Sequence, residues 1–208
     1  MQIIKEICVD SFEDAINAEN SGADRIELCG RLDLDGLTPS RNLIKKVFLK
    51  LRIPIRVMIR PKHPSFVYSE DEIKTMIEDI NYCKKLGLDG VVFGCLNKDF
   101  SLNINQIQLL SNVAKPLNVI IHKAIDKTDS VLSSLSLLLK IKNINGVLSS
   151  GGKRFAINST ETLKKMVDLA PNNFEIICAG GITFKNLSNL HSKIEGNYYH
   201  GKKIIKLN

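Results

Sequence analysis

The sequence predicts an α/β fold in which residues 1–208 form one domain, a closed (β/α)8 TIM-type barrel. Three observations lead to this prediction. Short apolar segments alternate with longer amphipathic segments along the whole chain, which is typical of strand–helix units with a parallel sheet. Eight such units fit a barrel better than an open doubly wound sheet, which is the alternative. Uncommon polar residues follow several of the apolar segments, where a barrel carries its functional groups.

The first two units define the pattern. Residues 3–9 are a β-branched run and predict a strand, and Asp10 or Ser11 is expected to cap the helix that follows, through about Ser21. Gly22 suits the left-handed position after a helix. Residues 25–28 then predict a short buried strand that Gly30 ends.

The same order of elements repeats to the end of the chain. The sequence Gly-apolar-Asp-x-apolar of residues 22–28 returns at 87–94 and, degraded, at 143–148. Strands are expected at 55–59, within 87–94, at 118–122, within 143–148, at 175–178 and at 197–200. Helices are expected from Thr38-Pro39 to Lys50, from Ser69 to Leu86, at 105–113, at 129–141, from Asn158, and from Thr183 to His191.

The last predicted strand ends eight residues before the end of the sequence. This leaves no convincing eighth helix, so we expect a barrel that is truncated or incomplete at its C-terminal helix.

Composition narrows the class of protein. The net charge is +7, but Lys and Arg are interspersed with Asp and Glu, so we expect no nucleic-acid partner and favour small anionic ligands. No apolar run is long enough for a membrane span, and the N-terminus lacks a signal-peptide pattern. Five cysteines without paired spacing indicate a reducing compartment, so the expected location is the cytoplasm.

Charged and titratable residues follow the predicted strands and are the candidate catalytic groups. They are Glu27, Arg60, His122 and Asp126. Buried charge has a net cost unless it is paired or has a function. Glu27 and Arg60 would satisfy this rule by pairing across neighbouring strands, and a carboxylate could simply hold His122 in place. The alternative is that these residues carry out acid–base chemistry at one rim.

Two glycine-rich loops are candidate anion-binding sites, because amides without side chains in the way suit phosphate or carboxylate. The residues are Ser150, Gly151 and Gly152 after the sixth predicted strand, and Gly180 and Gly181 after the seventh. Barrel phosphate sites usually follow strands seven and eight, and paired glycines also serve turn geometry alone.

Cys8 and Cys29 are the best-placed cysteines for a metal, because they come from adjacent strands and thiolates select soft ions such as Cu(I). Packing as small apolar side chains is the alternative for each cysteine. The sequence contains no CxxC, HExxH or Walker-type motif.

Several co-linear segments resemble the CutC family of copper homeostasis proteins. They include GADRIELC at 22–29, Val57-Met58-Ile59-Arg60-Pro61, GLDGVVFG at 87–94, His122-Lys123-Ala124-Ile125-Asp126, Ser150-Gly151-Gly152 and Ala179-Gly180-Gly181. The resemblance implies a cytoplasmic (β/α)8 barrel, a homodimer or higher homo-oligomer, with a role in copper tolerance and Cu(I) binding through cysteine. The chain departs from the family pattern at Lys123 and Ile125, at Leu37 and at Ile182.

The sequence leaves two candidate functions. The first is Cu(I) binding by Cys8 and Cys29, with Met58 or His122 as further ligands. The second is a barrel enzyme for a small phosphorylated or carboxylated metabolite. There Glu27 or His122 would transfer protons, Arg60 would hold the anion, and Asp126 would orient His122.

Overall fold

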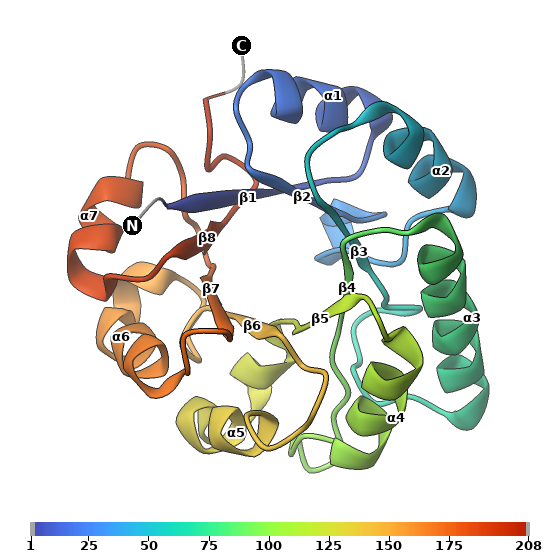
Figure 1. The fold of residues 1–208 in the computed structure, drawn as a ribbon. Helices are drawn as coiled ribbons and strands as arrows, with labels where there is room; N and C mark the ends of the chain where they lie inside the picture. The colour runs from blue at the N-terminus through green and yellow to red at the C-terminus, as the bar shows by residue number, and fades with distance from the viewer. Residues whose placement is uncertain (1–2, 207–208) are drawn as a thin grey trace.

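The computed structural model describes residues 3–206 and confirms the predicted barrel. The closed sheet runs β1-β2-β3-β4-β5-β6-β7-β8, and every neighbouring pair is parallel. Figure 1 looks along the barrel axis and shows the helices outside the ring of strands. The strands are β1 Ile4–Val9, β2 Arg25–Leu28, β3 Ile55–Met58, β4 Gly90–Phe93, β5 Asn118–Ile121, β6 Gly146–Ser149, β7 Glu175–Cys178 and β8 Tyr198–His200.

Seven α-helices cover the outside of the barrel in the described part of the chain. They are α1 Phe12–Asn20, α2 Arg41–Lys50, α3 Glu70–Leu86, α4 Ile104–Ala114, α5 Val131–Leu138, α6 Thr160–Leu169 and α7 Leu187–Ile194. None of them is long and apolar enough to cross a bilayer. No helix follows β8 up to residue 206, as expected, yet the barrel closes because β8 pairs directly with β1.

Helix boundaries follow local capping chemistry. Ser69 accepts from the Glu72 amide, and the Glu72 carboxylate accepts from the Ser69 amide, so the predicted capping box is present. Gly22 and Gly87 have φ angles of +85° and +76° after α1 and α3, a conformation that glycine adopts without strain.

Some predicted boundaries are wrong because another residue makes the cap. Ser40, and not Thr38, accepts from the Leu43 amide, so α2 begins later than predicted. Thr38 instead accepts a hydrogen bond from the Arg60 amide. Asp129 does not begin α5, because Ser130 caps that helix.

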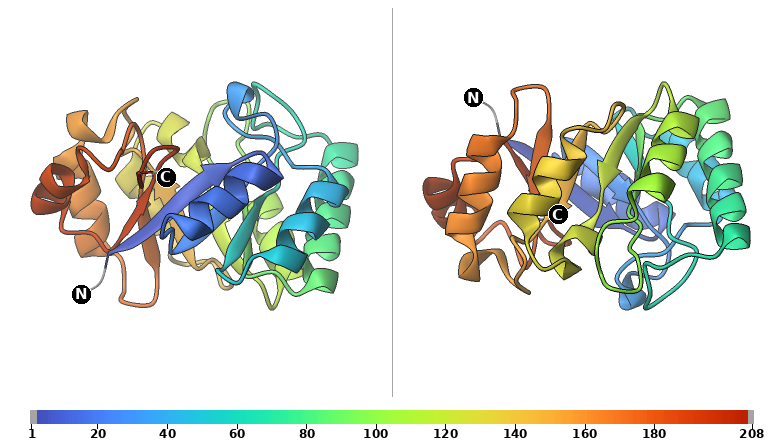
Figure 2. Two further views of the ribbon diagram at one scale, coloured as in Figure 1. Left: turned by 90° about the horizontal axis from the view of Figure 1, so that it is seen from above. Right: turned by 90° about the horizontal axis from the view of Figure 1, so that it is seen from below.

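Two apolar layers enclose the strands. Outward-facing strand residues pack under the helices, and an inner cluster fills the middle of the barrel with Met58, Val92, Ile120, Leu148 and Ile177 among its members. Both side views in Figure 2 place the start of β1 at one end of the barrel and the loop after β2 at the other. The inner cluster lies between polar groups at the two ends of the strands, and Glu6 connects these groups by contacting both Arg25 and His200.

Candidate functional site

Strand register brings the inward-facing groups of β8, β1 and β2 together. Cys8 lies opposite Glu27 in the β1–β2 pair, and Glu6 lies opposite His200 in the β1–β8 pair. All four residues are buried. Because successive side chains in a strand alternate between its faces, Glu6 and Cys8 share the inner face of β1.

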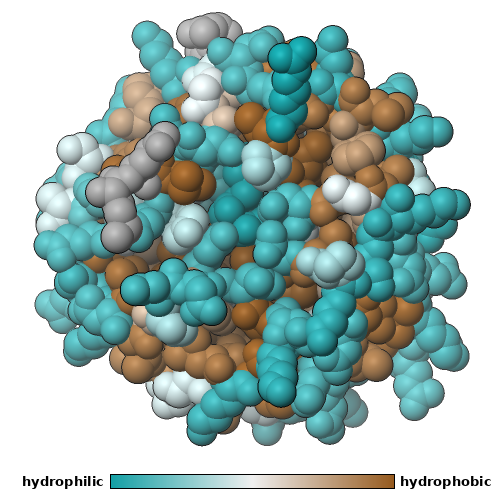
Figure 3. Space-filling model, viewed as in Figure 1, coloured by the Kyte–Doolittle hydropathy of each residue, from teal (hydrophilic) through white to brown (hydrophobic). Residues whose placement is uncertain are grey.

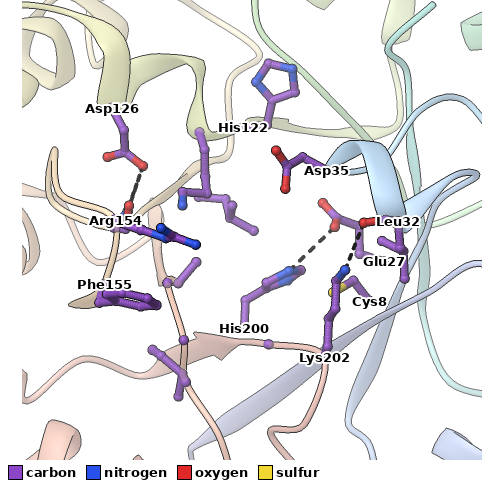
Figure 4. A pocket seen from close by; sticks show the side chains of 18 of the residues that line it. Cys8, Glu27, Leu32, Asp35, His122, Asp126, Arg154, Phe155, His200 and Lys202 are labelled. Carbon is purple, nitrogen blue, oxygen red and sulfur yellow. Dashed lines mark hydrogen bonds and ion pairs between the residues drawn. The ribbon is translucent and has the colours of Figure 1, made fainter. Parts of the chain in front are cut away.

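Cys8, Glu27 and His200 form a group with the composition of a metal site. One ligand atom from each lies within 4.8 Å of the other two. The close-up in Figure 4 shows the three side chains turned toward one another at the floor of a cavity. Thiolate and imidazole ligands suit copper and zinc, and a carboxylate oxygen completes a mixed set.

His200 is held at both ring nitrogens. Its Nδ1 lies 2.8 Å from Glu6 Oε1, and its Nε2 lies 3.6 Å from Glu27 Oε2. Burial alone would lower the pKa of His200, but the Cys8 sulfur and the Glu27 and Glu6 carboxylates raise this pKa well above its usual value. A carboxylate behind the second nitrogen is also the arrangement that orients a metal-binding histidine.

Cys29 lies next to this group but is not a member of it. Its thiol donates to Glu27 Oε2 at 3.5 Å. Burial, and then the Glu27 charge, raise the pKa of Cys29 well above its usual value. Burial also raises the pKa of Glu27. As a metal ligand, Cys29 stays a prediction.

Arg60 does not pair with Glu27, contrary to one interpretation of the sequence. Its Nη1 donates to the carbonyl oxygens of Leu34, Asp35 and Gly36 at 3.1–3.3 Å. The guanidinium also stacks 4.6 Å above the Phe66 ring. Arg60 therefore holds the loop after β2, and its proposed contact with an anion stays a prediction.

His122 is a neutral imidazole that packs beside Phe66 and forms no hydrogen bond or ion pair with Glu27. The two ring centroids lie 4.8 Å apart, and in Figure 4 the His122 ring points away from Glu27. Burial, and then the Arg60 charge, lower the pKa of His122 to about 3. Its Nδ1 accepts from the Ala124 amide, so the proton resides on Nε2. A protonated Nε2 disfavours His122 as a metal ligand.

Asp126 does not orient His122, and that expectation is wrong. Its carboxylate accepts from Ser149 Oγ, from Ser150 Oγ, and from the amides of Ser150 and Gly152, at 2.6–2.9 Å. The Gly151 amide donates to Ser149 Oγ. The predicted anion loop after β6 therefore binds a carboxylate, but one that belongs to the chain itself.

The cavity above the floor has a volume of about 910 Å³. Cys8, Glu27 and His200 line it, as do Gly180 and Gly181 after β7. A volume of this size suits an organic molecule. Three buried polar atoms of lining residues have no hydrogen-bond partner in the described chain, namely Glu27 Oε1, Arg60 Nε and His122 Nε2.

A second charged network fills the opposite end of the barrel. Arg25 contacts Glu6 and Glu175, while Arg56 contacts Glu175 and Asp89 at 2.7–2.8 Å. Figure 3 shows the face at the N-terminal strand ends, where hydrophilic side chains cover the centre of the barrel. These charges satisfy one another and indicate a structural role.

The sequence gives no role to His200, Glu6 or Arg25, although it places His200 among the polar residues at the ends of the predicted strands. A signal existed for Glu6, a charge inside a β-branched strand, and for His200, which ends the last strand. Their pairing depends on closure of the barrel between the first and last strands, which no local pattern specifies.

Comparison with known proteins assigns the chain to a known group. The model of the CutC family matches residues 3–205. The human copper homeostasis protein cutC homolog is 38% identical over 187 residues, 90% of this chain and 68% of the relative. A family protein CutC of Treponema denticola is 40% identical over 185 residues, 89% of this chain and 75% of the relative.

Solved structures agree on the fold. A crystal structure described as a copper homeostasis protein CutC of Streptococcus agalactiae superposes with a TM-score of 0.92 at 28% identity, covering 98% of this chain and all of that one. A phosphoribosylanthranilate isomerase of Thermotoga maritima reaches a TM-score of 0.60 at 13% identity, covering 96% of this chain and 87% of that one, which supports the barrel fold alone.

Proposed function

Because the chain belongs to the CutC family of copper homeostasis proteins, we propose that it binds copper as Cu(I) at the group formed by Cys8, Glu27 and His200. The observation that carries the proposal is the convergence of three ligand atoms from three strands within 4.8 Å. The names of the relatives support copper as the metal, and the positions of the three ligand atoms support this location for the site.

The donor set fits a soft or borderline ion. A cysteine sulfur is the ligand type that selects Cu(I), and an imidazole also suits copper. Glu6 at the Nδ1 of His200 leaves Nε2 on the side of Cys8 and Glu27. Binding would displace the Nε2 proton of His200, whose pKa is raised, so affinity should rise with pH.

The test is an anaerobic titration of Cu(I) against a chromophoric competing chelator. Cys8→Ser should weaken Cu(I) binding by at least about tenfold, because it removes a sulfur ligand. Cys83→Ser is the matched control, since Cys83 is also buried but lies in α3, outside the ring of strands. Cys29→Ser shows whether Cys29 also binds Cu(I), as the sequence predicts, or whether Cys8 is the sulfur ligand without it.

Two results would contradict this function. Unchanged Cu(I) affinity in Cys8→Ser, with the fold confirmed by circular dichroism, would remove the site. Tight binding of Zn²⁺ together with no measurable Cu(I) binding would keep a metal site there but reject copper.

A second candidate is acid–base chemistry on a small anionic metabolite. The cavity is far larger than one ion needs, and the unpartnered Glu27 Oε1 lies at its floor beside His200. In that function Glu27 would exchange protons with the substrate while His200 holds the carboxylate. Turnover of carboxylated and phosphorylated metabolites, followed by NMR, should be lost in Glu27→Gln. Absence of turnover across the panel would contradict this candidate.

A further inference from the structure

The two glycine-rich loops beside the cavity differ in what their amides bind. In the loop after β6, the amides of Ser150 and Gly152 donate to the Asp126 carboxylate at 2.9 Å. This loop is therefore an anion site that the chain has already filled. It shows that backbone donors can hold an anion at this edge of the barrel.

The loop after β7 has the same kind of backbone and no internal anion. The amides of Gly180, Gly181 and Ile182 have no hydrogen-bond partner within residues 3–206. All three residues line the cavity. Consecutive amides of this kind form the concavities that bind phosphate in other proteins.

Packing holds this loop in one conformation. Gly180 and Gly181 have φ angles of +102° and +69°. A Cβ on Gly180 would lie 2.8 Å from the Ser150 Cβ, and one on Gly181 would lie 2.8 Å from Phe155 Cδ1. The glycines therefore allow the loop to press against residues 150–156, so that the three amides are pre-positioned.

Cations surround the same part of the cavity. Besides Arg60, six lining residues carry positive charge and form no ion pair with any described residue: Lys123, Lys127, Lys153, Arg154, Lys202 and Lys203. Lys202 donates to the Leu32 carbonyl, and Arg154 lies over the Phe155 ring. Like charges around a concave site raise the local concentration of anions.

We propose that the loop Gly180–Ile182, with Arg154 and Lys203, binds the phosphate group of a small phosphorylated molecule. A phosphate offers several acceptor oxygens and close to two charges, which three amides and nearby cations match better than a carboxylate does. Phosphate sites of (β/α)8 barrels commonly involve the loops after strands seven and eight, the loops that carry Gly180 and Lys203. The inference goes beyond copper binding and uses none of the three proposed metal ligands.

The experiment is an NMR titration of the 15N-labelled protein with inorganic phosphate and with glycerol 3-phosphate at constant ionic strength. The amide signals of Gly180, Gly181 and Ile182 should shift and saturate. Those of Gly151 and Gly152 should stay in place, because internal acceptors already bind them. Arg154→Gln combined with Lys203→Gln should weaken binding at least tenfold, whereas Lys46→Gln on the exposed face of α2 should not.

Three outcomes would overturn the inference. The three amides could fail to respond to phosphate, they could respond equally to chloride, or the double variant could bind as tightly as the wild type. The titration of Cys8→Ser separates this inference from the copper proposal, because phosphate binding should persist there even where Cu(I) binding is lost.

Discussion

The two polar ends of the barrel interior differ in whether their charged and polar groups have partners within the protein. At the N-terminal end, Arg25 and Arg56 each contact two carboxylates, and the network closes on itself through Glu175. At the C-terminal end, Glu27 Oε1, Arg60 Nε and His122 Nε2 are buried without a hydrogen-bond partner among the described residues. Arg25 Nη2 also forms no hydrogen bond within the described chain but lies 3.0 Å from Glu175 Oε2, so every charge of the N-terminal network has a partner of opposite sign.

This difference between the two ends indicates which charged groups stabilise the fold and which are available to a ligand. Charges that satisfy one another explain their own burial, whereas an unpartnered buried polar atom has a cost that a ligand can remove. We therefore assign the N-terminal network to the fold and the C-terminal groups to ligand binding.

The largest expected effect is at the N-terminal end. Arg56→Met removes the cation that pairs with Asp89 and one of the two cations that pair with Glu175, and it should lower the free energy of unfolding by about 3–5 kcal/mol. Arg41→Met breaks an exposed ion pair with Asp79 and should cost less than about 1 kcal/mol. Urea unfolding of both variants measures the two losses of unfolding free energy. Equal losses would contradict a structural role for the N-terminal network.

A smaller effect is expected at the filled anion loop. Asp126→Asn weakens charge-assisted hydrogen bonds to the loop after β6 and should lower the free energy of unfolding by about 2 kcal/mol. Asp99→Asn, at an exposed loop position, is the control. Cu(I) affinity should not change in Asp126→Asn. Loss of copper binding without loss of stability would place Asp126 in the site instead.

The smallest effect concerns pH. The pKa of His122 is lowered to about 3 by burial and by Arg60, so the folded state does not take the proton that an unfolded histidine binds below pH 6.5. The stability that depends on a neutral His122 is therefore fully present above pH 6.5. As the pH falls, the free energy of unfolding decreases, by about 1.4 kcal/mol at pH 5.5. His122→Gln should therefore flatten the stability profile between pH 7.5 and 5.5.

Urea unfolding at the two pH values makes this measurement. An NMR titration of the His122 ring supplies the control, since no protonation is expected above pH 4. A ring that titrates near 6.5 would show that His122 is open to solvent.

The fold was predictable because its signals are local. Strand 25–28, strand 175–178 and the Ser69 capping box follow from residues near one another in the chain, and the structure confirms them. The site was predictable only in part. That Glu27 and Cys29 share a face follows from strand periodicity, but the pairing of Glu6 with His200 joins residues 194 positions apart.

The two glycine loops show the same limit. Their sequences look alike, and nothing in them indicates that Asp126 fills one and leaves the other open. That difference depends on where the 3-10 turn after β5 places a side chain, at a distance of 26 residues from Gly152. The charge of Asp126 makes it a candidate site residue, but its role depends on contacts with residues 149–152 that only the folded chain forms.

The most direct test compares one carboxylate from each end, the buried Glu27 and the half-buried Glu175, by urea unfolding and Cu(I) competition on the same samples. Glu175→Gln should lower the free energy of unfolding by about 2–4 kcal/mol and leave Cu(I) affinity unchanged. Glu27→Gln should leave the free energy of unfolding unchanged or higher and weaken Cu(I) binding by about tenfold or more. The account is contradicted if Glu27→Gln destabilises the fold as much as Glu175→Gln does and still binds Cu(I) with wild-type affinity.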